Sequence, residues 1–96
     1  MNFNSDNMLA IGSVVKLKGA DILAMIVGYG MATDKQYYDY LGVLYPNGLS
    51  AYKDYLYFNV DEIDNVVFSS YKDESYESLR KVLPERLNII KKEINK

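Results

Sequence analysis

The spacing of apolar residues changes once along the chain. From residue 11 to residue 71, apolar residues come in short runs separated by Gly, Pro, Asn and Asp. Short apolar runs between turn-forming residues indicate β-strands. We therefore predict strands over residues 14–17, 23–27, 37–45, 55–58 and 65–71. After residue 73, apolar residues recur at every third or fourth position, which indicates one stripe of a helix.

Turn-forming residues refine the predicted strands. Gly28 and Gly30 follow the second apolar run, and glycines at such a place indicate a bend. The sequence Pro46-Asn47-Gly48 predicts a turn after the third strand, because Pro presets one backbone angle and Gly accepts a positive φ. Asn59, with Glu62 three residues later, has the spacing of a capping box and predicts one helical turn before the last strand.

The C-terminal stripe predicts a helix over residues 73–95, with one interruption. Acidic residues stand near its start and lysines near its end, which complements the helix dipole. Pro84 lacks a backbone N–H and disfavours helical angles at Leu83. Pro84 therefore predicts either a kink in one helix or the boundary between two. The stripe consists of Tyr76, Leu79, Leu83, Leu87, Ile90 and Ile94.

Together these elements predict an α+β protein. We expect a small, curled antiparallel sheet of about five strands, similar to an SH3-like barrel, followed by a C-terminal helix that is kinked or broken near Pro84. An open antiparallel sheet with the helix over one face is the alternative. The 96 residues suffice for one domain, which we place at residues 9–96, with antiparallel strands over 9–71. The polar residues 1–8 are expected to form a disordered tail.

The composition argues against catalysis. The chain has no cysteine and no histidine, which removes disulfides, thiol nucleophiles and the commonest general base and metal ligand. The acidic residues of 61–64 lack the ligand spacing of a calcium loop. The sequence Gly28-Tyr29-Gly30 lacks the third glycine of a dinucleotide site. We therefore predict no enzyme, no catalytic residue, and no cofactor or metal site.

Charge and hydropathy address location and partners. The net charge of −2 argues against a general affinity for nucleic acid or anionic membrane. The N-terminus lacks the basic start and the sustained apolar stretch of a secretory signal. No apolar window has the length of a membrane span. We expect a cytoplasmic protein. A lesser alternative is a small barrel that binds single-stranded nucleic acid through exposed aromatics and the basic C-terminal residues.

Tyrosine is the unusual feature of the composition, with 10 in 96 residues. A fold this thin cannot bury all of these rings, and tyrosine offers a large contact area at a small cost in rotamer entropy. The tyrosines near the Pro46–Gly48 turn are the first candidates for binding a partner protein. The alternative is that the rings fill the edge of the core with their hydroxyls in water. The candidates are Tyr45, Tyr52, Tyr55 and Tyr57.

The end of the helical stripe is the second candidate surface. Leu87, Ile90 and Ile94 lie beyond Pro84 and are predicted to bind a partner helix or a second copy of the chain. Packing of the same residues on the sheet is the alternative. A homo-oligomer is therefore compatible with the sequence.

Four stretches of the sequence carry a family resemblance. They are residues 9–19 (LAIGSVVKLKG), residues 25–28 (MIVG), residues 38–48 (YDYLGVLYPNG), and residues 58–71, where FN, IDNVVF and Tyr71 match. Over residues 9–71 the chain resembles a small domain of unknown function found in Gram-positive Firmicutes. Members of that family resemble accessory proteins encoded beside type VII secretion loci, next to toxins that carry a helical LXG targeting domain.

The resemblance implies a role and a partner. It implies a cytoplasmic chaperone or targeting adaptor that binds the helical N-terminal domain of such a toxin before export. It implies no catalytic residue. An immunity protein, which would neutralise the toxin's C-terminal domain, is the alternative.

Overall fold

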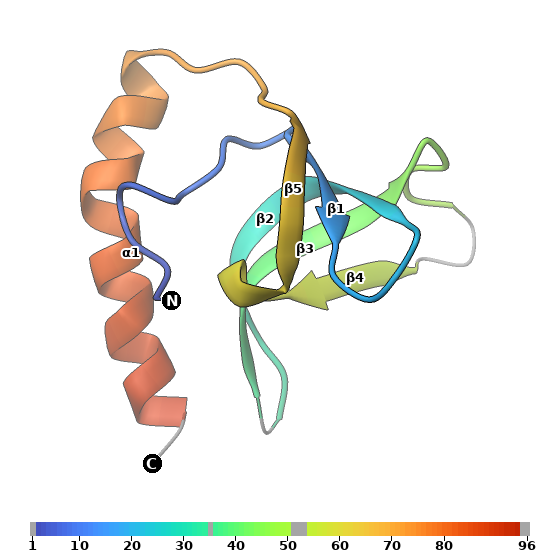
Figure 1. Cartoon of the computed structure of the whole chain (residues 1–96). Coiled ribbons are helices and arrows are strands. Elements are labelled where there is room, and N and C mark those ends of the chain that lie inside the picture. Colours follow the sequence, from blue (N-terminus) through green and yellow to red (C-terminus); the bar gives the residue numbers. More distant parts are fainter. Residues whose placement is uncertain (1, 35, 51–53, 95–96) are drawn as a thin grey trace.

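The computed structural model describes residues 2–34, 36–50 and 54–94. Within them the chain forms five strands, one 3-10 turn and one helix, in the order that the sequence predicts. Figure 1 shows the strands gathered on one side and the helix on the other. The elements are β1 (Val14–Leu17), β2 (Leu23–Ala32), β3 (Tyr37–Tyr45), β4 (Tyr55–Phe58), η1 (Val60–Glu62), β5 (Ile63–Phe68) and α1 (Glu74–Ile94).

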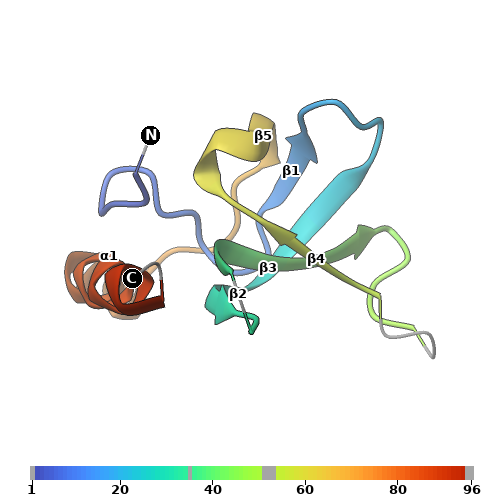
Figure 2. The ribbon, with the colours of Figure 1, turned by 90° about the horizontal axis from the view of Figure 1, so that it is seen from below.

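The strands form one antiparallel sheet in the order β4-β3-β2-β1-β5. The prediction of a five-stranded antiparallel sheet followed by a helix is confirmed. Among the described residues, β4 and β5 do not pair, so the sheet has two edges and is not closed into a barrel (Figure 2). Register shifts interrupt the β1–β5 and β2–β3 ladders, and such irregularities increase local twist.

The second strand is longer than its apolar run indicates. The prediction ended it at Val27, whereas β2 continues to Ala32 because β3 pairs with it along this whole length. The expected irregularity at the glycines is present, since the ladder shifts register between Ile26 and Gly28. Gly30 has a φ of 65°, in the left-handed region that favours glycine.

The core lies between the sheet and α1, and the first residues of the chain help to fill it. The backbone of α1 makes only sparse contact with the strands. Residues 2–9, which we call the N-terminal strap, run through the intervening space (Figure 1). Phe3 and Met8 are buried, so the prediction of a disordered tail is wrong for residues 2–8. The fully buried sheet residues are Val15, Ala24, Ile26, Tyr40 and Phe58.

The C-terminal element is a single helix. It begins with Asp73 accepting a hydrogen bond from the Tyr76 N–H at 3.1 Å and continues through Pro84, which therefore does not separate two helices. Pro84 and Leu87 are its buried residues. Leu87 packs against Gly30 of β2, which has no side chain to keep the helix away.

A buried carboxyl group joins η1 to β3. Asp39 accepts a hydrogen bond from the Val60 N–H at 2.9 Å, and the Asn59 side chain accepts one from the Asp39 N–H at 2.9 Å. The Glu62 side chain accepts a bond from the Asn59 N–H, as the capping-box spacing predicts. Burial raises the pKa of Asp39 above its ordinary value, and the Val60 N–H opposes this only in part.

We expect the substitution Gly30→Ala to destabilise the fold more than Gly19→Ala. Both glycines have a positive φ, so each alanine costs about 1–2 kcal/mol in backbone strain. A Cβ on Gly30 would also lie 2.4 Å from Leu87 Cδ2, whereas one on Gly19 meets nothing within 4 Å. The clash should add about 1–3 kcal/mol. Urea denaturation of both variants measures this, and equal losses of stability would contradict the packing described.

We expect Asp39→Asn to flatten the dependence of stability on pH. Because the pKa of Asp39 is raised on folding, its contribution is fully present below the ordinary value of 3.8 and is lost as pH rises through the folded pKa. Asparagine keeps an acceptor for the Val60 N–H and carries no charge. The free energy of unfolding, wild type minus variant, should therefore fall as pH rises through this window. A difference that rises with pH would refute the buried, desolvated carboxyl.

Candidate partner-binding surface

A row of directly opposed residues crosses the whole sheet on the face away from the core. Opposed residues of antiparallel strands share a face, and successive residues of a strand alternate between faces. Val14 is therefore on the face opposite its buried neighbour Val15. We call the face that carries Val14 the outer face. From edge to edge its row is Tyr55, Val43, Met25, Val14 and Phe68.

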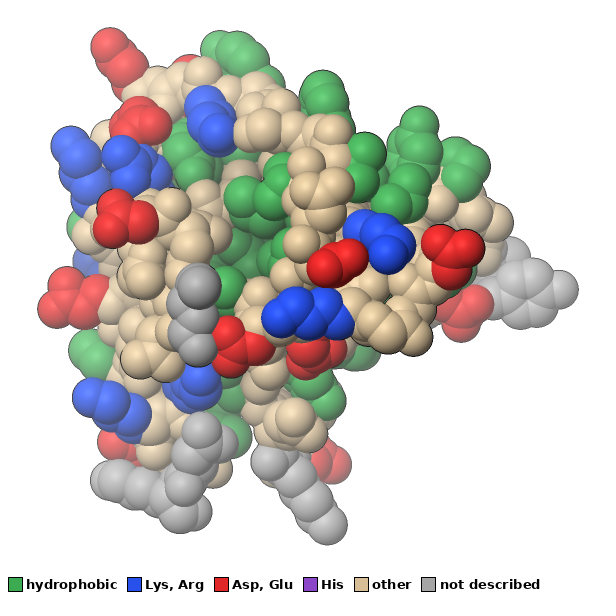
Figure 3. Space-filling model, viewed as in Figure 1, with side chains coloured by type: hydrophobic (Ala, Val, Ile, Leu, Met, Phe, Trp, Pro, Cys, Tyr) green, Lys and Arg blue, Asp and Glu red, His purple; other side chains and the backbone are tan. Residues whose placement is uncertain are grey.

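The outer face is apolar and partly open. Tyr45, Tyr55 and Phe68 keep 50%, 40% and 56% of their surface exposed, while Val14 and Val43 between them are buried. A groove of about 400 Å³ lies on this face. Figure 3 shows hydrophobic side chains gathered at the upper right, over the end of β5 and the loop after β3. The groove is lined by Gly12, Val14, Leu23, Met25, Tyr45, Val67 and Phe68.

One of the two irregularities in β5 shapes a wall of the groove. Val14 opposes Phe68 and Val15 opposes Val66, so Val67 is an extra residue on β5. Such a bulge places two consecutive side chains against one on the partner strand. Val67 therefore lines the groove together with Phe68. At the other end of β5, Lys16 and Asp64 form an ion pair with N and O 3.4 Å apart.

Two of the four tyrosines predicted to bind a partner lie on the outer face. Tyr45 and Tyr55 both belong to the outer face, because Val43 opposes Tyr55 and Tyr45 lies two residues further along β3. Tyr57 is also exposed, and its ring centroid lies 5.5 Å from that of Tyr38. Tyr52 lies outside the described residues.

The predicted helical residues do not form one free stripe. Leu87 is only 8% exposed and belongs to the core, which corrects its prediction as a partner-binding residue. The reason is Gly30, which lets α1 approach β2 at this point. Ile94 is partly buried against the same core, whereas Ile90 is exposed. The other exposed apolar residues of α1 are Leu79, Val82 and Ile89.

Sequence reasoning missed the contribution of β1, β2 and β5 to the outer face. Leu23, Met25 and Phe68 were assigned to strands but not to a binding surface. The run Val66-Val67-Phe68 offered a signal, because three consecutive apolar residues cannot all face a core from a regular strand. Recognising it requires knowing that β5 is an edge strand.

The described residues also bear on metal binding and on membrane insertion. In that part of the chain, no group of three or more Asp and Glu residues is arranged to hold a metal ion. Helix α1, over its described length, is not apolar enough to cross a membrane.

We expect Leu87→Asp and Ile90→Asp to have different effects, although both residues lie in the same helical turn. Aspartate at position 87 would bury an unpaired charge among core residues and should cost about 3–5 kcal/mol. At position 90 the carboxylate stays in water, so the cost should be below about 1 kcal/mol. Thermal unfolding followed by circular dichroism measures both. A tolerated charge at position 87 would show that α1 does not dock as described.

The comparisons with known proteins place the chain in a family. A family model described as a domain of unknown function (DUF4176) matches residues 8–79. No curated protein and no solved structure matches the chain. The matched range spans all five strands, and with them the whole outer face, and it ends within the second turn of α1. Because this range is well over half of the chain, the protein belongs to the DUF4176 family.

Proposed function

We propose that this protein is a non-catalytic protein-binding module, a cytoplasmic chaperone or targeting adaptor for an LXG toxin exported by type VII secretion. The observation that carries the binding role is the outer face, where an apolar groove lined by Tyr45 and Phe68 lies beside the exposed Tyr55 and nothing in the described chain covers it. The choice of partner rests on the resemblance over residues 9–71 to proteins encoded beside such toxins.

The chemistry of the outer face suits a protein partner. Tyr45, Tyr55 and Phe68 offer large rings that are already held by the strands, so little rotamer entropy is lost when they are covered. The groove between Tyr45 and Phe68 can take apolar side chains from one face of an amphipathic helix. A helical toxin domain presents such faces. The lack of histidine and cysteine supports binding without catalysis.

A co-expression pull-down against the toxin encoded beside this protein tests the proposal. The N-terminal helical half and the C-terminal half of the toxin are expressed separately, and light scattering after size exclusion gives the stoichiometry. Capture of the N-terminal half at a fixed ratio is the expected result. Capture of the C-terminal half instead would make the protein an immunity protein, and capture of neither would overturn the assignment of the toxin as partner.

We expect Tyr55→Ser and Phe68→Ser each to weaken the complex by at least about fivefold, and the double variant by more. Tyrosine is enriched among the few interface residues whose truncation costs more than about 1 kcal/mol, and Phe68 lines the groove itself. Val82→Ser and Ile89→Ser are matched controls, since these α1 residues are comparably exposed and lie away from the groove. Isothermal titration calorimetry gives the affinities. Should the controls weaken the complex as much as Tyr55→Ser, α1 and not the sheet would be the interface.

A further inference from the structure

The N-terminal strap is held in an unusual way. Residues 2–9 belong to no helix or strand, yet five of their carbonyl groups accept hydrogen bonds from side chains outside the strap. These donors come from both sides of the space that the strap fills. Tyr29 of β2 bonds Leu9, Tyr40 of β3 bonds Asn7, and from α1 Tyr76 bonds Met8, Arg80 bonds Ser5 and Asn88 bonds Phe3.

Two apolar side chains anchor the strap between these bonds. Phe3 is 1% exposed, and its ring meets that of Tyr40 edge-on with centroids 5.3 Å apart. Met8, five residues later, is also buried in the core cluster. The side chains of Asn2, Asn4 and Asp6 are exposed. The strap therefore turns its anchors toward the core, between the sheet and α1, and its polar residues toward water.

This arrangement is typical of peptide recognition. Side-chain donors aimed at carbonyl groups bind the main chain of a segment whatever its side chains are, and pockets for a few anchors supply the specificity. The tyrosine hydroxyls are suited to this role because they remain protonated donors. Burial raises the pKa of Tyr29 to about 12.

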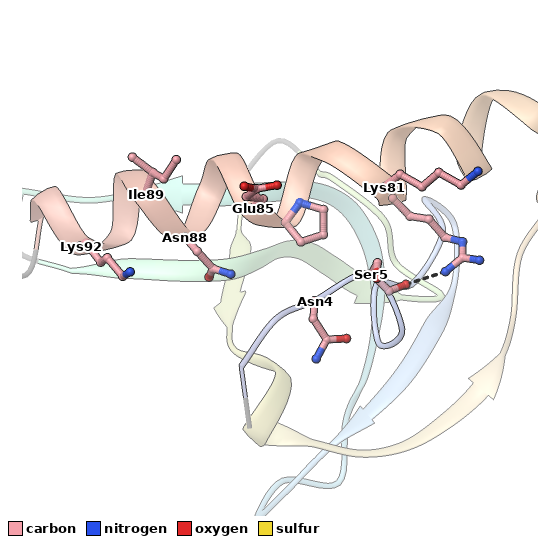
Figure 4. A pocket seen from close by; sticks show the side chains of 9 residues that line it. Asn4, Ser5, Lys81, Glu85, Asn88, Ile89 and Lys92 are labelled. Atoms are coloured by element: carbon pink, nitrogen blue, oxygen red, sulfur yellow. Dashed lines mark hydrogen bonds between the residues drawn. The ribbon is translucent and has the colours of Figure 1, made fainter.

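Most of the strap, and the part of α1 that it contacts through Arg80 and Asn88, lie outside the residues that the family model matches. Residues 2–7 and 80–94 lie outside the matched range, and they bond each other through Arg80 and Asn88. Figure 4 shows the place where they meet, with Asn4 and Ser5 beside Lys81, Glu85 and Asn88. These residues surround an open hollow of about 450 Å³. One side of the strap thus faces solvent, and in the described chain the strap pairs with no strand of the sheet.

We propose that the space between the inner face of the sheet and α1 is a peptide-binding groove, which residues 2–9 of the chain fill in cis. Its ligand is a segment with an aromatic anchor, an aliphatic or methionine anchor five residues later, and between them a turn like that of residues 5–7. Recognition combines the five side-chain donors with the sites of Phe3 and Met8. This groove lies on the opposite face of the sheet from the outer face, so the inference does not depend on the proposed function.

A labelled synthetic peptide of residues 2–10 tests the proposal on the full chain. In the variant Phe3→Ala the tethered segment loses its aromatic anchor, so the peptide should bind in trans, as followed by fluorescence anisotropy. The wild-type chain should bind it at least tenfold more weakly, because a tethered competitor acts at an effective concentration of the order of millimolar. A control peptide carrying Phe3→Ala should bind the variant at least tenfold more weakly than the native peptide.

The opposite results overturn the proposal. Equal binding to wild type and variant would place the peptide elsewhere, and no binding to a folded Phe3→Ala chain would show that the groove is not a ligand site. If Phe3→Ala unfolds the sheet, amide hydrogen exchange of the variant Tyr76→Phe tests the proposal instead. This variant removes one hydrogen-bond donor to the strap and keeps the aromatic ring. Faster exchange confined to residues 2–9 and α1 is expected. Equal acceleration in β2 and β3 would make the strap an inseparable part of the core.

Discussion

The contact on which this structure most depends is the set of hydrogen bonds between three tyrosine hydroxyls and the main chain of residues 7–9. Tyr29 and Tyr40 reach this segment from the sheet and Tyr76 reaches it from α1. Because the backbone of α1 touches the strands only sparsely, the segment is the layer through which helix and sheet are joined. A buried carbonyl group left unpaired would cost about 1–3 kcal/mol, so each hydroxyl also makes burial of the segment possible.

The abundance of tyrosine therefore has two separate causes. On the inner face, rings fill the core and their hydroxyls bond the main chain, as in Tyr29 and Tyr40. On the outer face, Tyr45 and Tyr55 keep half or slightly less of their surface in contact with water. The alternation of a strand decides which group a residue joins. Composition alone counts both groups together, which is why the excess of tyrosine indicated an interface without locating it.

Much of the fold could be predicted because its signals are local. The bounds of β1, β3 and β4 agree with prediction, since Gly, Pro and Asn mark the turns beside them. The errors concern contacts between distant parts of the sequence. Phe3 looked like part of a disordered tail because its partners, Tyr40 and Asn88, lie 37 and 85 positions away. Leu87 looked free because its docking depends on the missing side chain of Gly30.

The candidate surface follows from how few elements this chain has. A small sheet built of apolar-rich strands has two faces to cover, and one helix with one strap can cover only the inner face. Closing the sheet would hide more of it, but the two edge strands, β4 and β5, do not pair with each other among the described residues. On the outer face, Val14 and Val43 are therefore covered only by neighbouring side chains of the same face. Tyr55 and Phe68 stand at the two ends of their row. A partner that covered this row would complete the second layer that the described part of the chain does not provide.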